Sequence, residues 1–105
     1  MTQLKDKTAN LCEVCGFDEF FQRHHIKPRR CGGSSGMGNL IALCPNCHHR
    51  ADRNTLKPKF LFECVAKRLD RQLEEGTLAV DVYRRAQARI SQYLAELENE
   101  NDFWD

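Results

Sequence analysis

Two pairs of cysteines have the spacing of a metal-binding knuckle. Cys12 and Cys15 are separated by two residues, and so are Cys44 and Cys47. Two such turns supply the four thiolates of a tetrahedral structural zinc site. The N-terminal residues contain no apolar stretch that resembles a secretory signal, so we expect a cytoplasmic protein whose thiols bind metal rather than form disulfides. The sequence therefore predicts Zn²⁺ on these four cysteines; the alternative is four thiols that only pack or oxidise.

All four histidines occur in two doublets. His24-His25 lies between the cysteine pairs, and His48-His49 directly follows the second pair. If zinc holds the two segments together, the doublets come close in space. Facing imidazoles can bind a divalent ion and leave positions open for water and phosphate. A histidine with an ordinary pKa of about 6.5 can also remove a proton from water near neutral pH.

Short elements must position these side chains. Residues 19–26 are rich in aromatic and β-compatible types and predict a strand that ends before Pro28. Residues 31–38 include four glycines and predict a loop, and residues 39–43 predict a second strand. Pro45 suits the first turn of a helix that runs to about residue 54. The histidine doublets then lie at the end of a strand and at the start of a helix.

The remainder of the chain is predicted to be helical. From Pro58, the apolar residues Leu61, Val65, Leu69 and Leu73 recur every four residues, and Gly76 suits the helix end. A second amphipathic helix starts at about residue 81, with Tyr83, Ala86, Ile90, Tyr93 or Leu94, and Leu97 on one stripe. Two such helices joined by a short turn predict an antiparallel hairpin, with Cys64 near its apolar face. We assign no role to Cys31.

The ordered run of residues resembles the HNH endonuclease motif with zinc-binding cysteines, over residues 12–52. It passes through Cys12-x2-Cys15, His24-His25-Ile26-x-Pro28, Gly32-Gly33, Asn39-Leu40 and Leu43-Cys44-x2-Cys47-His48. The resemblance implies an α+β fold: a zinc-stapled ββα-metal (treble-clef-like) core, followed by the C-terminal helical hairpin. We place the nuclease core at 1–57, the hairpin at 58–97 and an acidic tail at 98–105.

The resemblance also implies a role for each matched position. His24 and His48 correspond to ligands of a catalytic divalent ion, and His25 corresponds to the general base. Asn39 corresponds to the middle asparagine, which braces the loop and helps to orient the base. Many relatives have a further histidine where this chain has Asp52. Asp52 is one helical turn from His48 and could complete a Mg²⁺ or Mn²⁺ site, or could be a solvated acid.

Charge is distributed unevenly along the chain. Residues 1–60 contain ten Lys and Arg against five Asp and Glu, whereas residues 61–105 contain six against ten. Candidate phosphate contacts are the basic residues Arg23, Lys27, Arg29, Arg30, Arg50 and Arg53. A solvated surface of mixed charge would look the same. We expect DNA as the partner, with RNA not excluded, and no membrane.

The resemblance implies an endonuclease that hydrolyses phosphodiester bonds and leaves 5′-phosphate and 3′-hydroxyl ends. The alternative is a non-catalytic zinc module that binds nucleic acid or protein. The module explains the cysteines, but it does not explain two histidines and an asparagine at nuclease positions. The C-terminal helices could cover the core, form a homodimer, or dock in a larger phage or restriction assembly. Sequence specificity, and nicking as against double-strand cutting, are left open.

Overall fold

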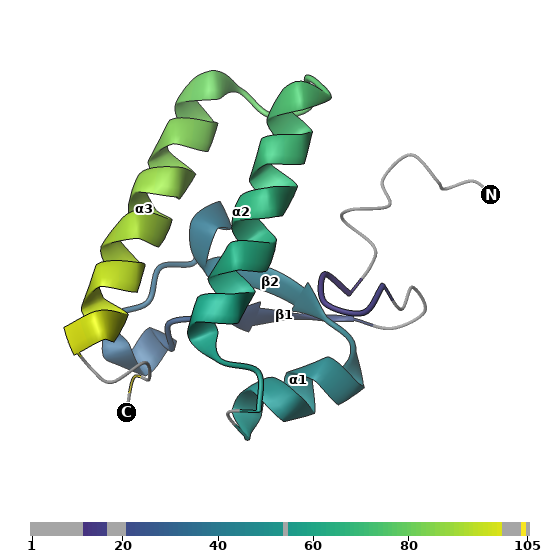
Figure 1. The fold of residues 1–105 in the computed structure, drawn as a ribbon, viewed down its shortest axis with the longest axis vertical. Helices are drawn as coiled ribbons and strands as arrows, with labels where there is room; N and C mark the ends of the chain where they lie inside the picture. Colours follow the sequence, from purple (N-terminus) through teal and green to yellow (C-terminus); the bar gives the residue numbers. More distant parts are fainter. Residues whose placement is uncertain (1–11, 17–20, 54, 100–103, 105) are drawn as a thin grey trace.

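The chain has an α+β fold with a two-stranded sheet and three helices among residues 12–16, 21–53, 55–99 and 104, which the computed structural model describes (Figure 1). The elements are, in order, β1 Gln22–His25, the 3₁₀ turns η2 Arg29–Cys31 and η3 Met37–Asn39, β2 Leu40–Leu43, α1 Pro45–Asp52, α2 Pro58–Glu74 and α3 Val80–Asn99.

The two strands pair antiparallel, with His24 opposite Ile41 and His25 opposite Leu40. The ladder continues past β1, because the Ile26 N–H donates to the Asn39 carbonyl at 2.9 Å. Both strands are shorter than expected. Residues 19 and 20 lie outside the described residues, and Asn39 closes the η3 turn instead of starting β2, since its N–H donates to the Gly36 carbonyl.

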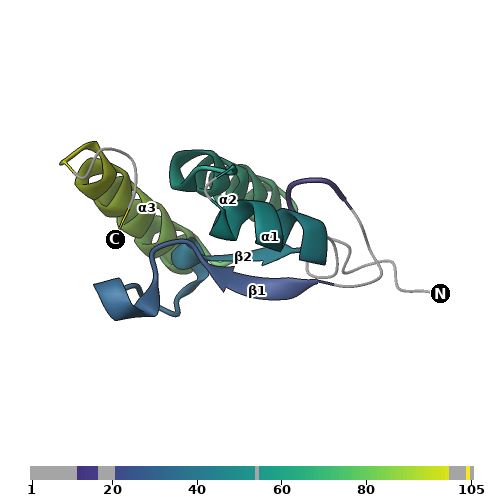
Figure 2. The same cartoon turned by 90° about the horizontal axis from the view of Figure 1, so that it is seen from below.

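Helix α1 begins at Pro45, where proline loses no helical hydrogen bond. Its N-cap is Cys44, whose Sγ accepts the Cys47 N–H at 3.5 Å. The helix ends at Asp52, two residues before the expected end. Seen from below, α1 and α2 lie on the same side of the sheet (Figure 2).

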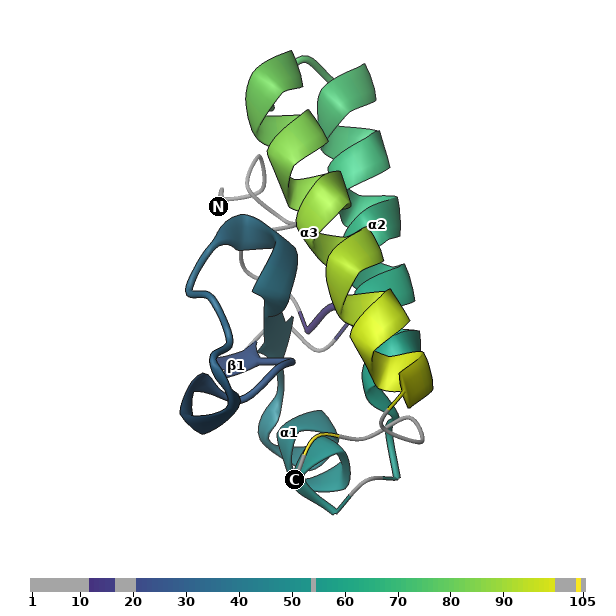
Figure 3. The ribbon, with the colours of Figure 1, turned by 90° about the vertical axis from the view of Figure 1, so that its left-hand side faces the viewer.

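Helices α2 and α3 lie side by side, and their connection is remote from α1 (Figures 1 and 3). The expected stripes face inward: Leu61, Val65, Leu69, Ala86, Ile90, Tyr93 and Leu97 are buried. Leu73 is only half-buried, because it lies near the end of α2 that leads into the connection to α3. Phe62, outside the expected stripe, is fully buried. None of the described helices is long and apolar enough to cross a membrane.

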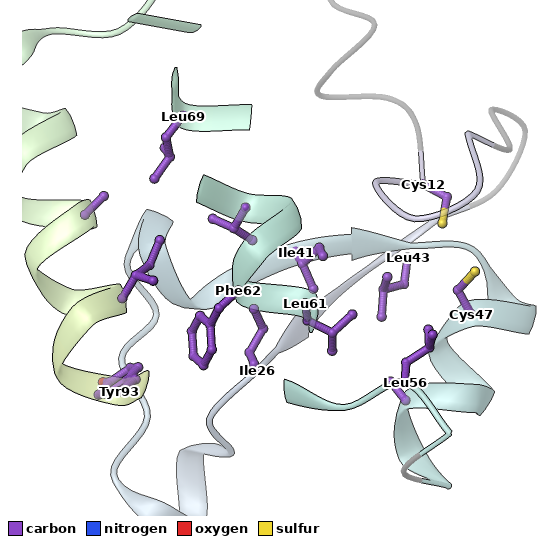
Figure 4. Packing of buried hydrophobic residues seen from close by; sticks show 14 of the residues in the cluster. Cys12, Ile26, Ile41, Leu43, Cys47, Leu56, Leu61, Phe62, Leu69 and Tyr93 are labelled. Atoms are coloured by element: carbon purple, nitrogen blue, oxygen red, sulfur yellow. The ribbon is translucent and has the colours of Figure 1, made fainter. Parts of the chain in front are cut away.

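One continuous core joins the cysteine cluster to the helix pair (Figure 4). At one end Cys12 and Cys47 pack with Leu43 and Leu56. At the other end α2 packs against β2, and α3 packs against α2 and the η3 turn. The elements that present the histidines therefore share one packed interior with the cysteine cluster.

Candidate metal centres

The first candidate centre is the four-cysteine cluster. Cys12 and Cys15 come from a turn that Gly16 closes at φ 82°, and Cys44 and Cys47 come from the start of α1. The four sulfur atoms lie within 4.8 Å of one another, and Cys15 Sγ is 3.6 Å from Cys44 Sγ. Zinc–sulfur bonds of about 2.3 Å place tetrahedral sulfurs about 3.8 Å apart. The donor set therefore fits a structural zinc ion.

The charge balance of the cluster also calls for a cation. Burial acts to raise the pKa of the Cys12 thiol, but hydrogen bonds with the backbone of Cys15, Cys44 and Val14 lower it to about 7. Burial raises the pKa of Cys47, and the neighbouring sulfurs raise it further. Four adjacent thiols cannot all ionise without a positive charge between them. A divalent cation supplies that charge.

Glu13, inside the first cysteine pair, fastens the knuckle to the rest of the molecule. Its N–H donates to the Ala42 carbonyl at 2.8 Å, and its Oε2 accepts the Ala42 N–H at 2.9 Å. The same carboxylate pairs with Arg68 of α2, which also donates to the Met37 carbonyl. Burial raises the pKa of Glu13, and the Arg68 charge opposes that rise. Sequence reasoning missed this pair, because 55 residues separate its members.

The second candidate centre joins β1 to α1. The ligand atoms of His24, His48 and Asp52 lie within 4.8 Å of one another. The two imidazoles meet edge to face with centroids 5.2 Å apart, and His48 Nδ1 is 3.4 Å from Asp52 Oδ2. Burial, and then the nearby His48, lower the pKa of His24, which favours the neutral form that binds metals. Two imidazoles and a carboxylate can hold one divalent ion.

These three residues line a cleft of about 440 Å³. Its other lining residues are Arg23, His25, Ile26, Pro28, Arg30, Ala51, Leu56, Pro58, Leu61 and Trp104. His25 therefore shares the cleft with the second centre, and its Nε2 is 3.1 Å from the Ser35 hydroxyl oxygen. A possible base and a possible metal site are thus side by side.

Asn39 is fully buried and does not line the cleft. Its Oδ1 accepts the Lys27 N–H at 2.7 Å, and its Nδ2 donates to the carbonyls of Lys27 at 3.1 Å and Ser34 at 2.7 Å. One amide thus connects the two ends of the 27–34 segment, which follows β1. This is the geometry of a loop brace.

The expected phosphate contacts separate into three groups. Arg23 and Arg30 line the cleft. Arg29, Arg50 and Arg53 are exposed outside its lining. The ammonium of Lys27 is directed elsewhere: it pairs with Glu96 at 2.6 Å and lies 4.8 Å from the centroid of the Tyr93 ring, with 12% of the side chain exposed.

Four further residues lie in or near the candidate site and the core. His49 is exposed and does not line the cleft. Cys64 is half-buried against the core. Sequence reasoning missed Ser35 and Trp104. Composition placed Ser35 in a loop, and the only sign of Trp104 was an aromatic residue within an acidic tail.

Comparison with known proteins gives two kinds of match. The family described as HNH endonuclease matches residues 12–53. The chain is 33% identical over 51 residues to the type IV methyl-directed restriction enzyme EcoKMcrA of Escherichia coli (strain K12), covering 40% of this chain and 18% of that enzyme. It is 34% identical over 56 residues to Anaredoxin of Nostoc sp. (strain PCC 7120), covering 52% of this chain and 74% of that protein. No solved structure matches significantly.

Proposed function

Because the chain belongs to the HNH endonuclease family, we propose that it is a metal-dependent endonuclease that hydrolyses phosphodiester bonds in DNA. The observation that carries the proposal is the cleft in which His25 lies beside the cluster of His24, His48 and Asp52. A non-catalytic zinc module would have no need for this second cluster. The chain spans only 18% of the restriction enzyme, so we do not propose that it shares that enzyme's substrate.

The proposed architecture has three parts, which are a metal-binding core, a helical hairpin and a tail. Residues 1–57 form the ββα-metal, treble-clef-like core with zinc on Cys12, Cys15, Cys44 and Cys47. The hairpin predicted at 58–97 corresponds to α2 and α3, although α3 runs two residues further, to Asn99. Most of the predicted tail, 98–105, lies outside the described residues.

The chemistry assigns a task to each side chain. A phosphodiester repels hydroxide, so hydrolysis needs charge neutralisation and an activated water. His24, His48 and Asp52 would hold a divalent ion such as Mg²⁺ or Mn²⁺, which supplies positive charge to the scissile phosphate and the departing 3′-oxygen. His25 takes the proton from the attacking water. Arg23 and Arg30 hold backbone phosphates along the cleft. The products carry 5′-phosphate and 3′-hydroxyl ends.

Plasmid nicking tests the proposal. The wild type is assayed with Mg²⁺, Mn²⁺ or Ni²⁺ and with EDTA, beside His25→Ala and the matched control His49→Ala. We expect metal-dependent cutting, a loss of about 10²–10⁴-fold in His25→Ala, and little change in the control, whose imidazole lies outside the cleft. A wild type that cuts with none of the ions would favour the non-catalytic module. Equal cutting by His25→Ala would remove His25 as the base.

A further inference from the structure

Ser34 is held from two sides. Its N–H donates to the hydroxyl oxygen of Tyr93 at 3.1 Å, and its carbonyl accepts from Asn39 Nδ2 at 2.7 Å. The next residue, Ser35, has its hydroxyl oxygen 3.1 Å from His25 Nε2. A short path of hydrogen bonds and one peptide unit thus leads from α3 to the imidazole of His25.

The α3 end of this path is rigid. Tyr93 is 2% exposed, and its ring centroid lies 5.9 Å from that of Phe62 and 5.9 Å from that of Trp104. One turn further along α3, Glu96 pairs with Lys27. Helix α3 therefore holds the 27–34 segment near both of its ends. A hydroxyl fixed in this way can hold a loop with little further loss of entropy.

A histidine base needs this kind of support. A histidine base works only if its free nitrogen faces the attacking water, and a hydrogen bond at the other nitrogen holds the ring in that orientation. His25 is the last residue of β1 and is only half-buried, so packing alone does not fix its ring. Ser35 lies within hydrogen-bonding distance of Nε2, and Ser35 is itself exposed. The position of Ser35 therefore depends on the two hydrogen bonds that fix Ser34.

We propose that Ser35 and Tyr93 are positioning residues for His25: Tyr93 fixes Ser34, and Ser35 then sets the orientation of the imidazole. The catalytic part of this proposal rests on the proposed nuclease function. Ser34, Ser35 and Tyr93 do not line the cleft, so they act through His25 rather than on substrate. Their loss should therefore change kcat rather than KM.

Kinetics test the proposal with four variants. Ser35→Ala removes the hydroxyl beside His25, and Ser35→Thr keeps one. Tyr93→Phe removes only the hydroxyl that Ser34 uses. Tyr83→Phe is the matched control, because it removes the other tyrosine hydroxyl of α3, which bonds Asp70 instead.

We expect kcat to fall about 10-fold in Ser35→Ala and about 3- to 10-fold in Tyr93→Phe, with KM unchanged. Ser35→Thr should recover most of the rate, and Tyr83→Phe should match the wild type. Unchanged kcat in both Ser35→Ala and Tyr93→Phe would overturn the proposal. A loss confined to KM would also overturn it, because it would indicate a role in binding.

A second measurement does not depend on cutting. Proton NMR of the protein with one equivalent of zinc should show a single side-chain rotamer of His25, with its ring close in space to the Ser35 methylene group. Ser35→Ala should give averaged rotamers of His25, and Tyr93→Phe should speed hydrogen exchange of the Ser34 amide while Tyr83→Phe does not. An unchanged His25 rotamer in Ser35→Ala would overturn the proposal. If the wild type cuts no DNA, the proposed function fails, and these spectra still decide the hydrogen-bonded path.

Discussion

At the scale of single residues, Asn39 combines complete burial with three hydrogen bonds to the backbone. It is the one polar residue among the described side chains that is fully buried, and both its amide oxygen and its amide nitrogen are hydrogen-bonded. It accepts one backbone N–H and donates to two carbonyls. Only an amide offers this combination in so small a volume.

Asn39→Asp should therefore be destabilising. A carboxylate can still accept the Lys27 N–H, but the carbonyls of Lys27 and Ser34 would lose their donor and face a buried negative charge. We expect the free energy of unfolding to fall by about 2–4 kcal/mol in urea titrations followed by Trp104 fluorescence. Asn99→Asp adds the same charge at an exposed position and should change stability by less than about 0.5 kcal/mol. Equal stability of the two variants would show that the amide hydrogen bonds contribute little.

Residue types and spacing predicted much of the candidate site. The C-x2-C pairs predicted that four sulfurs would gather, and the histidine doublets predicted that imidazoles from a strand and a helix would meet. Ser35 and Tyr93 could not be predicted as partners of the site. Their positions depend on how α3 packs against a loop about 60 residues earlier in the chain, and no local pattern encodes that contact.

At the scale of elements, Gly38 sets how closely η3 approaches α3. A Cβ added there would lie 2.7 Å from the Ala86 carbonyl oxygen and 3.3 Å from the Ala86 Cα. These are backbone atoms of a helix, so they cannot move aside singly. The absence of a side chain at this position therefore allows the loop before β2 to pack directly on α3.

We expect Gly38→Ala to lower the free energy of unfolding by about 1–3 kcal/mol, because the two elements must separate. Gly36→Ala is the matched control: its Cβ would meet only the Ser34 hydroxyl oxygen, at 3.0 Å, which can move. Both variants restrict the unfolded chain similarly. The difference between their urea midpoints measures the clash, and equal midpoints would contradict it.

The pair of Lys27 and Glu96 links the same loop to α3 through charge. The hydrogen bond from Lys27 lowers the pKa of Glu96 below its ordinary value. The stability that this ion pair contributes is therefore complete above the ordinary glutamate pKa. It is lost as pH falls through the lowered pKa of Glu96. Because the Glu96 side chain is 32% exposed, we expect only about 1 kcal/mol.

The check is urea unfolding of the wild type and Glu96→Gln from neutral pH down to the lowest pH at which both samples keep their zinc. The wild type should be more stable at neutral pH, and the difference should shrink as pH falls. A difference that persists in acid would assign the effect to packing instead of charge.

The elements themselves were largely predictable, since apolar periodicity and proline positions predicted two strands and three helices. The bounds differ where single hydrogen bonds decide them. Asn39 closes a 3₁₀ turn, and α1 stops at Asp52. The η2 and η3 turns were not predicted, because a glycine-rich segment allows many conformations and tertiary contacts select one.

At the scale of the whole molecule, the cysteine cluster and the helix pair belong to one core, so zinc should stabilise the entire chain. We expect one zinc ion per chain by elemental analysis. Its removal by a strong chelator under reducing conditions should lower Tm by about 20 °C or more, or unfold the protein. Cys44→Ser should lose the ion, and Cys31→Ser should keep it. An unchanged Tm after complete removal of zinc would show that the core is equally stable without the metal.

The uneven charge of the chain bears on how DNA would be held. The N-terminal portion is basic and contributes most of the residues that line the cleft, whereas α2, α3 and the following residues are acidic overall. Lys27 is already paired with Glu96. Binding should therefore depend on the arginines of the cleft, Arg23 and Arg30. Each phosphate contact releases counterions, so its loss makes affinity less sensitive to salt.

In a His25→Ala background without added divalent ion, Arg23→Ala and Arg30→Ala should each weaken DNA binding. Each should also make the slope of log affinity against log salt shallower by about 0.9. Arg85→Ala is the control, because that arginine is 77% exposed on α3 and lies near Asp81. Fluorescence anisotropy of a labelled duplex gives the slopes. If all three variants kept the slope of the His25→Ala parent, DNA would be held by charges outside the cleft, and the cleft arginines would have another role.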